Sequence, residues 1–308
     1  MKISYLSEPV VDLNRCVNVA FDKPPTAKKI AELKTAAKAS RPIALTIGYD
    51  FFPTSKGELD LGYLADLPSL QSLSLTYVAG LRSLDFLESL PGLRFLRIDP
   101  TKTSKLSLRP IRSLRSLQAL KLDKQGTDLD VISELPELQY LSVQSSPLEN
   151  LDCLTRSSSL RALRIGLGSL NDLSFLAGTK LRYLELWQVR GLLTQDLEPV
   201  TKASRLEALM LDTLGKVTSL PRLEEIRRLH MREMNGLTDL HALSSAKKLE
   251  DLVIEGAEKL TPDSLTPLKN LHSLKRVSIG LGSQRQNETV AEMFKLPSPV
   301  PIYDFEFA

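Results

Sequence analysis

Few residues in this 308-residue chain could carry chemistry. The three histidines are His230, His241 and His272, and none stands beside another His, Cys or carboxylate at the spacing of a metal site. The two cysteines, Cys16 and Cys153, lie too far apart in the sequence to indicate a disulfide framework or a metal site. We therefore expect two reduced thiols, no metal and no cofactor.

Sequence patterns typical of catalysis are also missing. The chain has no Gly-x-Ser-x-Gly elbow, P-loop or dinucleotide fingerprint. Gly-Leu-Gly-Ser occurs at 166–169 and at 280–283, but no lysine follows it as in a phosphate-binding loop, so tight turns are expected. Neighbouring carboxylates, as at Glu224 and Glu225, are typical of a solvated face. The sequence thus predicts that the chain is not an enzyme.

The charge balance and the hydropathy of the chain disfavour nucleic acid and membranes as partners. The chain has 40 basic and 37 acidic residues, a balance that gives no electrostatic case for nucleic acid or an anionic membrane. A membrane helix needs about 18 apolar residues in a row, and no such run occurs. Glu8, Pro9 and Asp12 interrupt the apolar stretch that a signal peptide would need. We expect a cytoplasmic protein.

A repeat organises the chain. Its phrase is an apolar residue, two variable residues, a second apolar residue, one variable residue and a third apolar residue, and it recurs ten times at steps of 20 to 25 residues. Apolar residues at alternate positions indicate a strand with one buried face. The middle apolar residues of the ten copies are Leu73, Leu96, Leu120, Leu141, Leu163, Leu184, Leu209, Leu229, Leu252 and Val277.

One strand with its return segment cannot bury its own leucines, so successive copies must stack and share a core. The return segments are short and often contain proline, which predicts short helices or 3₁₀ turns, with a longer one at 193–202. Degenerate phrases predict cap strands at 17–19, 45–47 and 302–307, and helices at 27–40 and 289–295. The expected organisation is an N-terminal α/β cap over 1–60, repeats over 61–282 and a C-terminal cap over 283–308.

Phrases such as LPSLQSLSL, LPGLRFLRI and LPELQYLSV resemble leucine-rich-repeat proteins, and the step length is most similar to the internalin-like class. The resemblance implies an α/β solenoid: a curved right-handed stack with a parallel concave sheet and short helical or 3₁₀ convex segments. One feature departs from the family. The Asn or Cys expected five residues after the middle leucine is replaced throughout, from Val78 in the first copy to Gly282 in the last. Water or backbone groups must then satisfy the turn that leaves each strand.

The variable residues of each strand are expected on the concave face, where a partner would dock. Trp187 is the only tryptophan, and exposed Trp, Tyr and Arg dominate interface hot spots. An alternative remains open, in which the aromatic rings pack on their cross-strand neighbours. The candidate partner-binding residues are Phe95, Arg97, Lys121, Tyr140, Arg164, Tyr183, Glu185, Trp187, Arg228, His230 and Arg232.

The leading hypothesis is a monomeric, non-catalytic scaffold that binds a protein on its concave face, as a regulator, an inhibitor or an immunity-type protein. The alternative is an anionic ligand or nucleic acid at the basic cluster of Arg228, His230 and Arg232. An enzyme ranks lowest, and the missing signal peptide disfavours a surface adhesin of the internalin kind. We expect no membrane contact.

Overall fold

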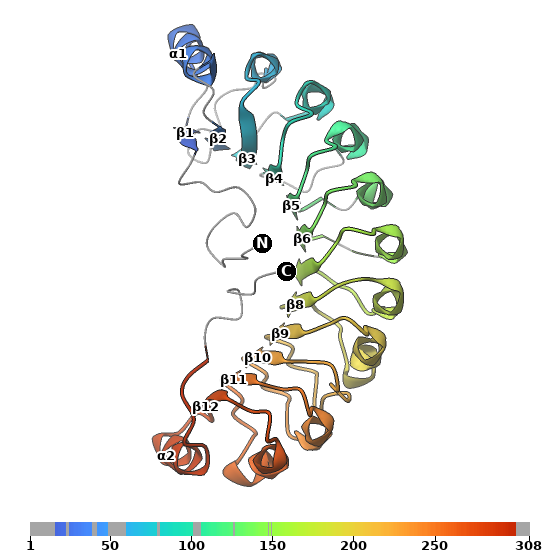
Figure 1. Ribbon diagram of the computed structural model, residues 1–308, viewed down its shortest axis with the longest axis vertical. Helices are drawn as coiled ribbons and strands as arrows, with labels where there is room; N and C mark the ends of the chain where they lie inside the picture. The colour runs from blue at the N-terminus through green and yellow to red at the C-terminus, as the bar shows by residue number, and fades with distance from the viewer. Residues whose placement is uncertain are drawn as a thin grey trace. The chain divides into compact units, whose positions relative to one another are not determined.

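The computed structural model describes residues 16–22, 25–38, 42–48, 60–78, 81–100, 106–125, 127–146, 148 and 150–299. They fall into two compact units, one of residues up to Ser146 and the other of the residues that follow. In each unit the strands line one side and the helical segments the other, as Figure 1 shows.

The first unit has six parallel strands that pair in the order of the chain. A helix, α1 (Ala27–Lys38), joins the first two strands, and 3₁₀ helices join most of the others. The strands are β1 (Val17–Phe21), β2 (Ile43–Gly48), β3 (Leu70–Val78), β4 (Phe95–Pro100), β5 (Ala119–Asp123) and β6 (Tyr140–Gln144). The 3₁₀ helices are η2 (Gly62–Asp66), η3 (Asp85–Ser89), η4 (Arg109–Ser113) and η5 (Leu129–Glu134).

The second unit repeats this plan with six more parallel strands. They are β7 (Ala162–Gly166), β8 (Tyr183–Trp187), β9 (Ala208–Asp212), β10 (Arg228–Arg232), β11 (Asp251–Glu255) and β12 (Arg276–Gly280). Its helical segments are η6 (Asp152–Arg156), η7 (Ser174–Gly178), η8 (Thr194–Lys202), η9 (His241–Ser245), η10 (Pro262–Asn270) and α2 (Gln284–Met293).

The repeat predicted from the leucines is confirmed by the register of the strands. Leu163 pairs with Leu184, Leu184 with Leu209, and the same alignment continues to Val277. Strands β1 and β2 lie where the degenerate phrases place them, while the strand expected at 302–307 lies outside the described residues. The middle leucines are at most 1% exposed, so each repeat buries its apolar face against its neighbours.

The predicted helices differ from the observed ones in their bounds. Helix α1 begins as expected, after Thr26, whose Oγ1 accepts a hydrogen bond from the Lys29 N–H at 3.4 Å. Helix α2 begins at Gln284 rather than near 289, because the Ser283 hydroxyl caps it by accepting from the Gln286 N–H. The longer segment at 193–202 is present as the 3₁₀ helix η8.

The turn that leaves each strand is satisfied by backbone groups. The residue four places after the middle leucine is left-handed in most repeats, as at Lys124 (φ 54°), Leu167 (φ 54°) and Thr213 (φ 55°). Its N–H donates to a carbonyl in the next repeat, for example from Leu167 to Trp187 at 2.9 Å. The following residue, where the family places Asn, fills the core instead. We call this series the amide ladder; in the second unit its donors are Leu167, Gln188, Thr213 and Glu233.

The ladder ends on residues beyond the last described strand. The N–H of Leu281 donates to Asn287 Oδ1 at 2.8 Å, so a side chain of α2 takes the place of the next strand's carbonyl. The N–H of Val277 donates to the carbonyl of Pro297 at 2.9 Å. These two bonds satisfy edge groups that no further described strand reaches.

One repeat of the second unit is short. Twenty-five residues separate Leu184 from Leu209, whereas only twenty separate Leu209 from Leu229. The long repeat carries the nine-residue η8, while residues 213–227 form no helix. The layer of helical segments is therefore interrupted behind β9 and β10.

Candidate functional site

The candidate residues lie on the sheet face opposite the leucine core, which we call the variable face. The prediction that its aromatic side chains are exposed is wrong at three positions: Phe95, Tyr140 and Tyr183 are only 0%, 5% and 1% exposed. Large and small residues alternate across the strands, and Tyr183 pairs in register with Ala162 and Ala208. Each ring therefore packs over small neighbours and is covered, as in the alternative left open above.

In the first unit a lysine covers two rings. The Lys121 Nζ lies 5.6 Å from the centroid of Phe95 and 6.0 Å from that of Tyr140. Arg97, part-exposed, forms an ion pair of 3.0 Å with the buried Asp99. Burial and the neighbouring Asp123 raise the pKa of Asp99 above its ordinary value, and Arg97 opposes that rise.

In the second unit a buried carboxylate organises the face. Glu185 is 3% exposed and forms an ion pair with Arg164, with 2.8 Å between Oε1 and Nε. The hydroxyl of Tyr183 donates to the other carboxylate oxygen at 2.9 Å. Glu185 was expected to be an exposed contact residue, and this is wrong, since its oxygens are directed to partners within the fold.

Burial also sets the acidity of this carboxyl. Desolvation raises the pKa of Glu185 above its ordinary value, and the charge of Asp212 adds to the rise. The cation of Arg164 and the hydroxyl of Tyr183 act in the opposite direction. The network therefore contains a carboxyl that depends on one arginine for its charge compensation.

Trp187 lies at the end of β8 and remains half-buried. The guanidinium carbon of Arg164 lies 4.9 Å from its ring centroid, so the arginine both pairs with Glu185 and stacks on the indole. Gly166, on the same strand β7 as Arg164, leaves the space that the ring needs, because a Cβ at this position would lie 2.9 Å from Trp187 Cε3. The indole is thus fixed in place while part of it faces solvent.

The three residues of the basic cluster come from one strand, β10, and each has an acidic neighbour. Arg232 donates to the buried Asp212 at 2.9 Å, and Arg228 lies 3.4 Å from Asp251. The Nε2 of His230 lies 3.7 Å from the Glu255 carboxylate. The three residues do lie together on one strand, as the sequence predicts, but acidic neighbours largely compensate their positive charge.

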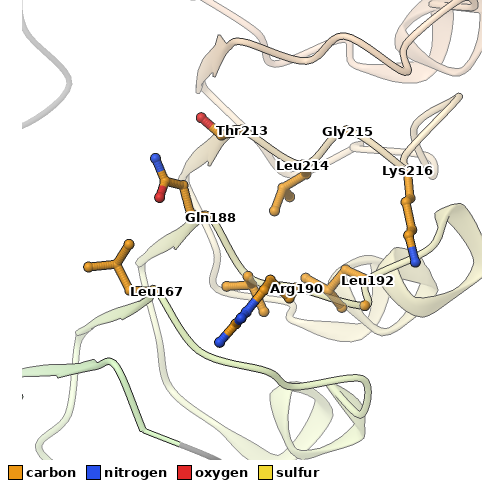
Figure 2. A pocket seen from close by; sticks show the side chains of 10 residues that line it. Leu167, Gln188, Arg190, Leu192, Thr213, Leu214, Gly215 and Lys216 are labelled. Carbon is orange, nitrogen blue, oxygen red and sulfur yellow. The ribbon is translucent and has the colours of Figure 1, made fainter. Parts of the chain in front are cut away.

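A hollow that the sequence patterns did not indicate opens at the ends of β7 to β9. It has a volume of about 790 Å³ and lies between the loops that follow β8 and β9 (Figure 2). Its lining mixes apolar residues such as Leu192 and Leu214 with two exposed cations, Arg190 and Lys216. The sequence feature that indicates this hollow is the change of repeat length from twenty-five to twenty residues, because the loops of unequal neighbouring repeats cannot align.

Metal ligands and membrane spans are both absent from the part of the chain that the structure describes. Within it, no group of three or more His, Cys, Asp or Glu side chains could hold a metal ion. None of its helices combines the length and the apolar character needed to cross a membrane.

No protein-family model matches this chain, and no curated protein does. Solved structures match at low sequence identity. An internalin, InlF, from Listeria monocytogenes is 18% identical with a TM-score of 0.47, over 83% of this chain and 77% of that chain. A leucine-rich-repeat protein from Leptospira interrogans is 15% identical with a TM-score of 0.42, over 92% and 95%. TLR13, solved in complex with ssRNA13, is 16% identical with a TM-score of 0.49, over 88% and 52%.

The assignment of the fold comes from the chain's own geometry. Successive strands are parallel, their leucines pair in register, and 3₁₀ segments return the chain on the opposite side. The repeat length of 20 to 25 residues falls in the range of one known repeat architecture. This chain has a leucine-rich-repeat fold.

Proposed function

We propose that the protein is a non-catalytic scaffold that binds a protein partner on the variable face of its second unit, around Trp187. The observation that carries the proposal is the state of this indole: it is part-exposed, Arg164 of β7 stacks on it, and Gly166 of the same strand leaves it room. A tryptophan that loses little freedom on binding is a typical interface hot spot.

Charged residues at the same register position as Trp187, two and three strands further along the sheet, support the same proposal. Arg232, with 40% of its side chain exposed, and Glu255, with 52%, offer polar groups on the same face of the unit. An apolar centre with a polar rim is the usual composition of a protein interface. Buried Tyr183 and Glu185 act beneath this surface as supports, because their polar atoms bond within the fold. The cytoplasmic location expected from the sequence remains part of the proposal.

The test combines partner capture with fluorescence. Proteins captured by the wild-type chain are compared with those captured by Trp187→Ala and by Tyr77→Ala, which removes an exposed aromatic residue of the first unit. We expect a partner that the Tyr77 variant retains and the Trp187 variant binds about 30-fold more weakly, a typical hot-spot loss of about 2 kcal/mol. The wild-type emission should shift when the purified partner binds, since the chain has a single tryptophan.

A partner retained equally by Trp187→Ala would contradict the proposal. Arg164 is unsuitable for this test, although the sequence suggests it, because its replacement would leave Glu185 buried beside no cation and disturb the fold.

The alternative, an anionic ligand or nucleic acid at Arg228, His230 and Arg232, is less favoured. Asp251 and Asp212 pair with Arg228 and Arg232, and burial favours the neutral form of His230, so the cluster has little of the excess positive charge that attraction for phosphates requires.

A further inference from the structure

A second basic cluster lies at the edge where strands β7 to β9 begin. It surrounds a hollow of about 330 Å³ lined by four cations, Arg161, Lys180, Arg182 and Arg205, and by two carboxylates, Glu207 and Glu225. The cluster belongs wholly to the second unit. Its lining carries more positive than negative charge.

The two carboxylates are already engaged. Glu207 receives a two-fold contact from Arg182, at 2.8 and 3.1 Å, and Glu225 pairs with Lys248 at 2.6 Å. Among the described residues no ion pair with a carboxylate joins Arg161, Lys180 or Arg205. The hollow thus faces three cations whose charge the surrounding carboxylates do not compensate.

The position of Arg161 breaks a regular pattern. The residue before each strand alternates in charge along this edge: Arg182 pairs with Glu207, Arg227 with Glu250, and Glu250 with Lys275. Arg161 is the exception, because its counterpart on the next strand is Arg182 rather than an acid. Like charges placed side by side cost free energy unless an anion lies between them.

Arg161 is also held in position. Its Nη1 donates to the carbonyls of Ser158 and Leu160 at 2.9 and 3.0 Å. Burial lowers the pKa of this guanidinium below its ordinary value, and the charges of Arg205 and Arg182 lower it further. The side chain is therefore oriented before any ligand arrives, in a field that favours an anion.

We propose that this hollow binds a phosphate monoester group, such as that of a phosphorylated side chain. At neutral pH the group carries a charge of about −1.5 to −2 and three acceptor oxygens, which suits several converging cations better than a single carboxylate does. The site is separate from the variable face, and its existence does not depend on the proposed docking around Trp187.

Binding is tested by calorimetry on the whole chain with four probes: inorganic phosphate, free phosphoserine, a short phosphoserine peptide, and the same peptide with Glu in place of phosphoserine. We expect the phosphopeptide to bind at least about tenfold more tightly than the Glu peptide. If the phosphopeptide binds more tightly than free phosphoserine, the natural ligand is a phosphorylated protein. If the two bind equally, the natural ligand is a small phosphate ester.

The variant is Arg161→Gln with Arg205→Gln, and its control is Arg285→Gln, an exposed arginine of α2. The double variant should lose at least about tenfold in affinity for the phosphorylated probes, while the control keeps it. Phosphate should also raise the Tm of the wild type and not that of the double variant, when each is compared with chloride at equal ionic strength. This second readout separates lost binding from lost folding.

Three results would overturn the proposal: no binding of any phosphorylated probe, unchanged affinity in the double variant, or tighter binding of a single-stranded RNA, a phosphate diester, than of the phosphopeptide. Failure of the Trp187 test leaves these outcomes untouched, and so the two proposals can be judged apart.

Discussion

Tyr140 and Tyr183 occupy the same position in the repeat, one in each unit, and both are buried on the variable face. Their neighbours differ. A lysine amine covers Tyr140, whereas the hydroxyl of Tyr183 donates to a buried glutamate that pairs with an arginine. In the first arrangement a cation lies over aromatic rings, and in the second a phenol, a buried carboxylate and a guanidinium form a polar network. Glu185 is the carboxylate on which the second arrangement is built.

The variant with the largest expected effect tests whether the network of Tyr183, Glu185 and Arg164 depends on the charge of Arg164. Arg164→Met should lower the free energy of unfolding at neutral pH by about 3–5 kcal/mol, because Glu185 would keep its burial and lose its compensating charge. Urea denaturation measures the change. The double variant Arg164→Met with Glu185→Leu should recover most of the loss, and a double variant as unstable as the single one would show that packing, not charge, is responsible.

The next effect concerns the indole that rests on this network. Gly166→Ala places a Cβ 2.9 Å from the Trp187 ring, so the ring must move at a cost of about 1–3 kcal/mol, with a shift of its fluorescence emission. Gly92→Ala in the first unit is the matched control, since a Cβ added at that glycine would meet nothing within 4 Å. That variant should stay within about 0.5 kcal/mol of the wild type.

The next prediction is a pH dependence of stability that arises from His230. The variable face of the first unit has no histidine. Burial lowers the pKa of His230 below its ordinary value of 6.5, and Arg232 adds to this, while Glu255 and Asp212 oppose it. The unfolded chain then binds more protons than the folded one, so stability present above pH 6.5 is lost as the pH falls through the folded pKa. His230→Gln should remove this part of the pH dependence, measured by urea denaturation across the range; an unchanged profile would assign it to another group.

The smallest effect is expected in the first unit. Lys121→Met removes the cation above Phe95 and Tyr140 and keeps an aliphatic cover, so the free energy of unfolding should fall by about 0.5–1 kcal/mol or less. A loss as large as that of Arg164→Met would mean that the two units do not differ in the way described.

The strands, their register and the 3₁₀ segments were predictable, because leucines at fixed spacing must face one core. The burial of Phe95 and Tyr183 was not predicted correctly, since it depends on the size of residues in neighbouring repeats, such as Ala119 and Ala208. That alternation of large and small residues is visible in the sequence once the repeats are aligned. The ion pair of Arg164 with Glu185 also joins two strands, and a single repeat gives no sign of it.

The left-handed turns could not be predicted from residue type. Lysine, leucine and β-branched threonine occupy the position at 124, 167 and 213, where Gly or Asn would be the usual sign. The conformation is imposed by the bond to the next repeat. The hollow around Arg161 could not be predicted from a single repeat either, because its cations come from three repeats.

The amide ladder has a consequence for how such a chain can grow. Every turn amide of the ladder reaches forward to a carbonyl of the following repeat, whatever its side chain, so the turn itself needs no particular residue when an internal repeat is duplicated or deleted. The last described repeat has no such freedom, because its amides depend on Asn287 and on the carbonyl of Pro297. A repeat inserted within the unit would therefore find its turn acceptor in the next strand, whereas a repeat inserted directly after β12 would take the Leu281 amide away from Asn287 and would need to supply another acceptor.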